Sequence, residues 1–202
     1  MRSMKALSIT LLLLLVALSL PAVAGVVNMN FISAGGNSYN GTSSYPYGFT
    51  VKGSPGSLMC IGYNEHIANG ETWLADVMTV DGYGALIGNA QKADELAYIF
   101  MQARANGGNP SFYNGVAWYI NEGVPDISGD PNALALYTTV TSMTFTPGEF
   151  PGLRVYVPIA GTESWQGELP QTFLGTPEPG TLLMLGSGIV GLAGLARKRL
   201  CS

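Results

Sequence analysis

The sequence predicts an α+β fold, a β-sandwich or open barrel with a helical insertion. Short runs of β-branched and aromatic residues, separated by Gly-, Asn- and Pro-rich turns, fill the first part of the domain up to residue 80. Apolar residues then recur at the three- and four-residue spacing of helices, and a last strand follows. This order indicates one domain in which the helices form the insertion.

The predicted strands share bulky β-branched or aromatic side chains and end at turn residues. They are 26–32, 45–51, 57–63, 72–80 and 153–159. A polar loop over 33–44 and a turn over 53–56 separate the first three strands.

Three helices are predicted in the insertion. Apolar side chains fall on one face over 89–105. A second helix is predicted to begin with Ser111 as its N-terminal cap and to end at Gly123. Asp130 followed by Pro131 predicts a third, because an acidic cap and a proline at the first helical position favour helix initiation.

Charge divides the 202-residue chain into three segments, although its formal net charge is only −4. Residues 25–176 hold four basic and twelve acidic residues, whereas 1–24 and 177–202 each have a net charge of +2. All aromatic residues lie in the middle segment, so the globular domain is assigned to 25–175. Because this domain has a net charge of −8, it repels phosphates and no nucleic-acid partner is expected.

The first segment, 1–24, predicts a secretory signal peptide. Two basic residues precede the apolar stretch 6–20, which is predicted to enter the membrane as a signal helix. Ala22 and Ala24 then form the small-x-small pattern of a cleavage site. Signal peptidase is expected to release a mature chain that begins at Gly25.

The last segment, 176–202, contains a predicted transmembrane helix. Residues 181–196 carry no charge, and as a helix they span about 24 Å, slightly less than a hydrocarbon core of about 30 Å. The basic residues Arg197, Lys198 and Arg199 follow at once. They are expected to stay on the cytoplasmic side and to leave the domain outside.

A Pro-Glu-Pro triplet precedes this helix, at Pro177, Glu178 and Pro179. The two prolines keep the triplet extended, a form in which a protease can bind it. Together the triplet, the short apolar span and the Arg-rich terminus resemble the PEP-CTERM sorting signal of exported bacterial proteins. The resemblance implies an exosortase that removes the tail, an inner-membrane intermediate, and a final place at the cell surface or outside the cell. It also implies association with exopolysaccharide or biofilm matrix.

The domain carries looser motifs: Cys60 at a strand end, a Gly-x-x-Trp turn at 70–73, the helix 93–100, an Ala-Trp helix and the closing segment 155–165. Over residues 45–175 it resembles a family of uncharacterised PEP-CTERM proteins. It is also distantly similar to thioester domains of bacterial surface adhesins, which join a strand cysteine to a helix glutamine.

Cys60 is the one thiol of the predicted mature domain, because Cys201 leaves with the tail. It therefore forms no intramolecular disulfide. The adhesin resemblance places Asn114, one methylene shorter than glutamine, at the position of the thioester partner. Three interpretations of Cys60 stay open: an inert buried residue, a thioester with Asn114, and intermolecular pairing or modification.

No catalytic, cofactor or metal site is predicted. His66 is the only histidine and falls in a predicted turn, and no serine lies in a nucleophile elbow. One His and one Cys do not make a zinc site. The acidic segment 126–130 offers oxygens to calcium but lacks EF-hand spacing, so a turn with a helix cap is the other interpretation.

Carbohydrate binding is suggested by aromatic residues in the first polar loop and beside it. Tyr39, Tyr45 and Tyr47, with Asn37 and Asn40, offer stacking faces and amide hydrogen bonds, or else pack over the sheet. The leading hypothesis remains a non-enzymatic, exosortase-processed protein of the surface or matrix. The alternative is an adhesin-like module that binds carbohydrate or reacts through its thiol, and a secreted hydrolase is the third.

Overall fold

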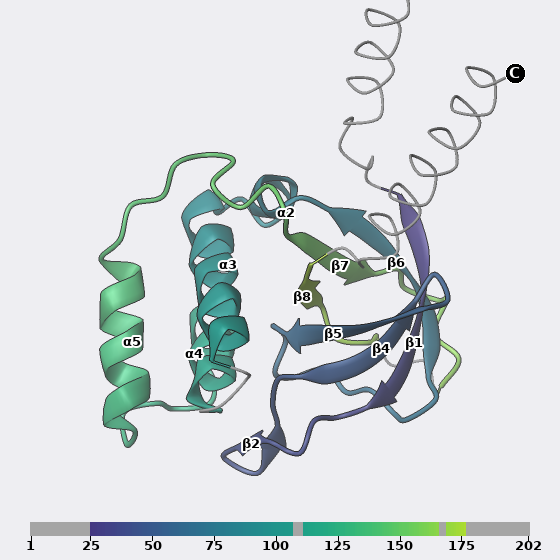
Figure 1. Cartoon of the computed structure of the whole chain (residues 1–202), viewed down its shortest axis with the longest axis horizontal. Coiled ribbons are helices and arrows are strands. Elements are labelled where there is room, and N and C mark those ends of the chain that lie inside the picture. The colour runs from purple at the N-terminus through teal and green to yellow at the C-terminus, as the bar shows by residue number, and fades with distance from the viewer. Residues whose placement is uncertain (1–24, 107–110, 166–168, 177–202) are drawn as a thin grey trace, which may run out of the picture.

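In a computed structural model the chain forms a six-stranded antiparallel barrel with a layer of helices beside it (Figure 1). The structure describes residues 25–106, 111–165 and 169–176. The strands are β1 (Val26–Ser33), β2 (Ser38–Tyr39), β3 (Thr42–Ser43), β4 (Tyr47–Val51), β5 (Ser54–Cys60), β6 (Thr72–Met78), β7 (Arg154–Pro158) and β8 (Phe173–Gly175). The helices are α2 (Val80–Leu86), α3 (Ala90–Ala105), α4 (Phe112–Glu122) and α5 (Pro131–Thr141).

The barrel is closed, in the order β1-β4-β5-β8-β7-β6. The prediction that the sheet stays open, as a sandwich or an open barrel, was therefore wrong, because the barrel is closed. The α+β class and a barrel architecture are confirmed. The difference arises from β8, which is only three residues long and pairs with both β5 and β7. A strand this short shows no alternation in the sequence, so the strand that completes the barrel was not predicted.

Aromatic rings fill the barrel. The ring of Phe49 lies 4.6 Å from that of Phe173, 5.3 Å from that of Phe31 and 5.8 Å from that of Trp73. These four side chains are all buried and come from four different strands. Their edge-on and tilted contacts fill the space between the strands, so the barrel interior is a packed core.

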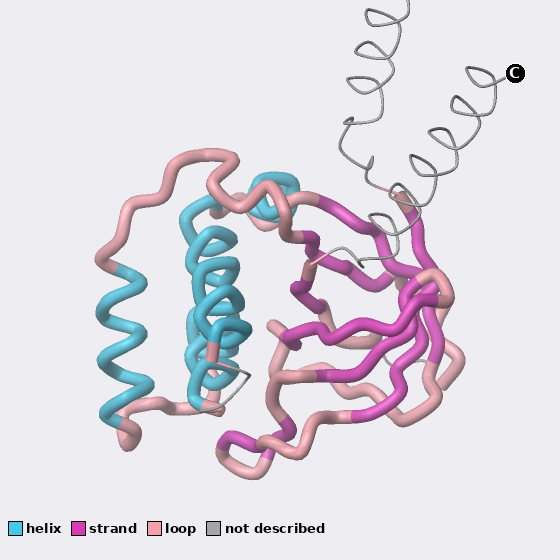
Figure 2. The backbone as a smooth tube through the Cα atoms, viewed as in Figure 1, coloured by secondary structure: helices cyan, strands magenta, loops and turns pink. Residues whose placement is uncertain are grey.

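The helices form the predicted insertion, since all four lie between β6 and β7 in the chain. Figure 2 shows them on one side of the molecule and the strands on the other, with α5 outermost. The predicted third helix begins as expected: Asp130 accepts hydrogen bonds from Asn132 N and Ala133 N, and Pro131 opens the helix. Gly123 ends α4 with a left-handed φ of 77°, also as expected.

Four local predictions were wrong. Ser111 precedes α4 but makes no side-chain cap hydrogen bond, because its backbone is already helical. The strand predicted over 72–80 ends at Met78, since Thr79 instead caps the unpredicted helix α2 by accepting a hydrogen bond from Gly82 N at 3.0 Å.

The other two corrections concern turns. The turn predicted over 53–56 lies at Lys52 and Gly53, whose φ values are 50° and 83°, so β5 begins at the next residue. The loop predicted over 33–44 contains the β2–β3 hairpin, whose turn at Asn40 and Gly41 has φ values of 49° and 82°. Both pairs of positive φ angles suit tight hairpin turns.

No helix among the described residues is long and apolar enough to span a membrane. The predicted signal helix, with its cleavage residues Ala22 and Ala24, and the predicted transmembrane helix over 181–196 lie outside the described residues.

Candidate functional site

The thiol of Cys60 lies between the barrel and helix α4. Cys60 is the last residue of β5, is fully buried and pairs with Phe173 of β8. Its Sγ lies 2.7 Å from the carbonyl oxygen of Gly62, to which the thiol donates. Cys60, the candidate reactive thiol of the sequence, therefore lies in the core. It stands at the seam, the boundary at which the helical layer packs against the barrel.

Asn114 of α4 reaches the same seam and is almost fully buried. Its Nδ2 donates to the carbonyl oxygen of Cys60 at 2.8 Å, and its Oδ1 accepts from Tyr45 N at 2.7 Å. The structure thus brings together the two residues that the adhesin resemblance paired. The amide contacts the backbone of Cys60, and both of its polar atoms already have partners.

Electrostatics keep this thiol protonated. Burial raises the pKa of Cys60 well above its usual range, and the carboxylates of Glu65 and Glu122 act in the same direction. Because the thiolate is the nucleophilic form, this shift disfavours nucleophilic attack by Cys60.

The nearby carboxylates of Glu65 and Glu122 approach the same glycine. A Cβ at Gly62 would clash with Glu65 Oε2 and lie 3.3 Å from Glu122 Oε1. A larger residue at position 62 would therefore require the Glu65 side chain to move. Sequence analysis missed this pair, because Glu65 follows a strand, Glu122 ends a helix, and no shared spacing links them.

The two carboxylates have different surroundings. Glu122 accepts hydrogen bonds from Tyr63 N at 3.0 Å, from Asn64 N at 3.1 Å and from Asn64 Nδ2 at 2.6 Å, and so fixes the loop after β5. Glu65 Oε2 is buried and makes no hydrogen bond to the described residues. Burial, and secondly the charge of Glu122, raise the pKa of Glu65.

Of the two interpretations of the loop tyrosines, stacking on carbohydrate or packing in the domain, the structure supports packing. Tyr39, Tyr45 and Tyr47 are all buried and belong to the core. The ring of Tyr39 packs on Gly115 of α4, where a Cβ would clash with it. These rings hold the β2–β3 hairpin and β4 against their neighbours, so they present no exposed stacking face.

The remaining sequence candidates lie apart from the seam or at its edge. His66 is an exposed residue of the loop after β5. Asp126 accepts hydrogen bonds from the backbone and hydroxyl of Ser128, and Asp130 caps α5, so the segment 126–130 is a turn followed by a helix cap. Within the described residues, no three His, Cys, Asp or Glu side chains gather in a way that would hold a metal ion.

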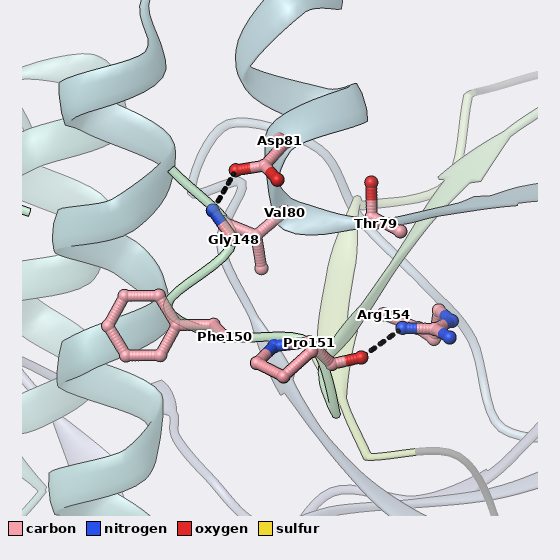
Figure 3. Close-up of a pocket in the computed structure, with 7 residues that line it drawn as sticks. All are labelled: Thr79, Val80, Asp81, Gly148, Phe150, Pro151 and Arg154. Atoms are coloured by element: carbon pink, nitrogen blue, oxygen red, sulfur yellow. Dashed lines mark hydrogen bonds between the residues drawn. The ribbon is translucent and has the colours of Figure 1, made fainter. Parts of the chain in front are cut away.

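A cavity of about 160 Å³ lies at the other end of β8 (Figure 3). The residues that line it come from the start of α2, the segment before β7, and β7 itself. They are Thr79, Val80, Asp81, Gly148, Phe150, Pro151 and Arg154. One acid and one base line the cavity, and in Figure 3 Asp81 points toward Gly148 while Arg154 is bonded to the carbonyl oxygen of Pro151.

Strand β8 ends at Gly175, which pairs with Arg154, one of the residues that line this cavity. A sorting signal directly after the last strand of a domain defines the class of exported proteins whose C-terminal tail is processed. Residues 176–199 match the PEP-CTERM protein-sorting motif. The chain therefore carries this motif, which marks it as an exosortase target exported through the membrane to the surface or the extracellular space.

The matched range contains the predicted sorting residues Pro177, Glu178 and Pro179, and the basic residues that follow the apolar span. Searches of curated proteins and of solved structures found no significant match to the chain.

Proposed function

We propose that the protein is a non-enzymatic component of the bacterial cell surface or extracellular matrix, associated with exopolysaccharide or biofilm. The observation that carries the proposal is the sorting motif at 176–199, which begins as the barrel ends at Gly175. Exosortase cuts the tail, and signal peptidase cuts the other end before Gly25. The delivered object is then the closed barrel with its helical layer.

Two features of the domain support a non-enzymatic role. Cys60 is a buried thiol with a raised pKa, and His66 is an exposed loop residue rather than part of a hydrogen-bonded triad. The seam that holds Cys60 makes its hydrogen bonds to backbone groups, which suits a structural joint.

Expression of the full chain in an exosortase-positive host tests this proposal. We expect the intact mass of the extracellular or surface form to show loss of residues 1–24 and of the tail. Replacing Pro177, Glu178 and Pro179 by alanine is expected to leave the tail attached and the protein in the membrane fraction. A wild-type protein that keeps its tail, or that stays in the cytoplasm, contradicts the proposal.

A covalent adhesin is the second candidate function, because Asn114 lies against Cys60. In that reaction the Cys60 sulfur would attack Cγ of Asn114, a C–S bond would form, and ammonia would leave after taking up the thiol proton. The same intact mass decides the matter. A mass lower by one ammonia, together with loss of the titratable thiol and sensitivity to methylamine, supports the adhesin, and an unshifted mass with one thiol contradicts it.

A secreted hydrolase is the third candidate, and the pair Glu65 and Glu122 is the observation in its favour. Two carboxylates in unlike surroundings are what a general acid and its partner require. A screen of glycan substrates with the secreted form, compared with its Glu122→Gln variant, tests this candidate. Activity that the variant lacks would support it.

A further inference from the structure

We propose that Glu65 and Glu122 form a proton-operated latch, in which the protonated carboxyl of Glu65 donates to the carboxylate of Glu122 and fastens the loop after β5 beside Cys60. Loss of that proton loosens the loop. The inference goes beyond the proposed function and does not rest on it, since it needs only the described domain. Three observations carry it: the convergence of the two carboxyl groups, the buried oxygen of Glu65, and the hydrogen bonds that tie the loop to α4.

The two carboxyl groups converge on Gly62. A Cβ there would clash with Glu65 Oε2 and lie 3.3 Å from Glu122 Oε1, so these two oxygens border the same small space. Two ionised carboxylates at one site repel each other, whereas a carboxyl and a carboxylate can share one proton in a short, charge-assisted hydrogen bond. The arrangement therefore favours one proton between the two groups.

The Oε2 atom of Glu65 has no hydrogen-bond partner among the described residues. The atom is buried, although the residue as a whole is only half-buried. An ionised oxygen in this position lacks the donors that its charge requires. With a proton, the same atom becomes a donor, and Glu122 Oε1 is an acceptor at the same glycine. Burial, and then the charge of Glu122, raise the pKa of Glu65 in the sense that this proton requires.

Protonation of Glu65 acts on the loop through Glu122. The Glu122 carboxylate accepts from Tyr63 N at 3.0 Å and from Asn64 N at 3.1 Å, and so ties the residues before Glu65 to the end of α4. When Glu65 is ionised, its repulsion with Glu122 opposes these bonds, because the repulsion falls as the loop moves away from α4. The closed loop is therefore favoured by the proton and disfavoured by its loss.

Cys60 lies beside the part of the loop that the latch holds. Its thiol donates to the carbonyl oxygen of Gly62 at 2.7 Å. The ring of Tyr63, the next residue, packs edge-on against that of Trp118 at 5.2 Å. Both contacts are lost when residues 62–64 move away from α4. The latch therefore controls access to a thiol that is fully buried in the closed form.

The groups that face the pair from other elements hold no competing negative charge at acid and neutral pH. Burial raises the pKa of the Cys60 thiol on β5 well above its usual range. Burial first, and then the two carboxylates, raise the pKa of Tyr83 on α2 to about 12. Lys92 of α3 donates to the carbonyl oxygen of Asn121 at 3.0 Å, so this base is bound by the backbone of α4.

Two further titratable groups belong to the loop itself. Glu71, at its far end, accepts from Ala68 N at 2.9 Å. His66 follows Glu65 directly, and its positive charge lowers the pKa of that carboxyl. Because a histidine changes its charge between about pH 5 and 8, the effect of His66 has to be separated from that of Glu65.

The test measures the proton and the loop separately in the purified protein. NMR titration gives the pKa of the Glu65 carboxyl, and hydrogen exchange from pH 4 to 7, corrected for the intrinsic rate, gives the opening constant at the Tyr63 and Asn64 amides. We expect Glu65 to titrate above 4.5 and the opening constant to rise by at least about threefold with pH, because the closed loop binds the proton more tightly than the open loop. Thiol labelling of Cys60, relative to the denatured protein at the same pH, should accelerate by the same factor.

Three variants separate the latch from other effects. Glu65→Gln carries a neutral amide that donates at every pH, so its opening constant is expected to stay at the wild-type value of pH 4 throughout. His66→Gln removes the neighbouring titratable group and should keep the wild-type profile. Asp76→Asn, at an exposed carboxylate of β6, is the matched control and should keep it too.

Each outcome decides the inference. A Glu65 carboxyl that titrates at 4.5 or below overturns it, and so does an opening constant that stays unchanged while Glu65 loses its proton. A wild-type profile in Glu65→Gln, or a flat one in His66→Gln, assigns the pH dependence to another group and also overturns it. If Glu65→Gln does not fold, the titration and exchange of the wild-type protein still decide.

Discussion

The barrel and the seam between barrel and helices are held in different ways. The barrel joins its strands by continuous antiparallel pairing and fills its interior with rings such as Phe49 and Phe173. The seam depends on single polar side chains that reach across to backbone groups: Asn114 to Cys60 and Tyr45, Asn121 to Ile61, and Glu122 to the loop after β5. Removal of a buried ring leaves a cavity in the barrel, whereas removal of a polar side chain at the seam leaves its backbone partners without hydrogen bonds.

This comparison predicts the largest loss of stability in the barrel. Phe173→Ala removes a fully buried ring from the central aromatic cluster and from the three-residue strand that closes the barrel. We expect the free energy of unfolding to fall by about 3–5 kcal/mol, measured by urea denaturation. Leu134→Ala, at an exposed position of α5, is the control and should change little. Equal losses in the two variants would contradict an aromatic barrel core.

The next largest effect is expected at the seam. Asn114→Ala leaves Cys60 O and Tyr45 N buried without their partner, and we expect a loss of about 2–4 kcal/mol, because each orphaned group costs about 1–3 kcal/mol. Hydrogen exchange should show the amide of Tyr45 losing protection before amides of β1 do. A loss below about 0.5 kcal/mol would mean that the seam is held by packing instead.

A smaller effect is expected in the outer helix. Asp130→Ala removes the cap of α5, which accepts from Asn132 N at 2.9 Å and Ala133 N at 3.1 Å. The expected loss is about 0.5–2 kcal/mol, while Asp130→Asn keeps an oxygen acceptor and should retain most of the stability. Thermal unfolding of the two variants shows whether Asp130 acts as a hydrogen-bond acceptor or through its charge. Equal losses of stability in Asp130→Ala and Asp130→Asn would mean that the charge matters and the cap does not.

The smallest effect concerns charge at the seam. The pKa of Glu65 is raised above its usual value of 4.5, so the folded state binds this proton more tightly than the unfolded state. Stability is therefore reduced as pH rises through 4.5 to the folded pKa, and the cost persists above it. Glu65→Gln is expected to stabilise the protein at pH 7, by less than about 1 kcal/mol because the group is partly solvated.

A measurement at low pH is the control for the effect of Glu65→Gln. The gain from Glu65→Gln should disappear below pH 4.5, where the wild-type carboxyl is protonated in both states. Chemical denaturation at pH 4 and pH 7 measures it. A gain that is the same at both values would show that the amide acts through new hydrogen bonds rather than through removal of a charge.

The sequence predicted those parts of the fold that local chemistry determines. Periodic apolar residues predicted α3, and the pair Asp130 and Pro131 predicted the start of α5. The tail motif was also accessible, because its three parts lie in order within one short stretch. In each case the signal is contained in neighbouring residues.

What the sequence did not predict depends on contacts between distant segments. Strand β8 is extended because β5 and β7 flank it, and its three residues carry no pattern of their own. Glu65 and Glu122 meet only because α4 packs on the loop after β5. The tyrosines of the first loop region were ambiguous for the same reason, since burial of a Tyr ring depends on what covers it, here Gly115 for Tyr39.

The closing register of the barrel also places the two ends of the described domain near each other. Gly25 lies beside β6 through its bond to Val77, and the chain leaves β8 at Gly175, beside the start of β7. Both predicted membrane segments therefore attach near one end of the barrel, while the hairpin turn at Asn40 and Gly41 follows the far end of β1 (Figure 1). On the predictions of a signal peptide and a transmembrane helix, we expect this hairpin to point away from the membrane before the two cuts are made.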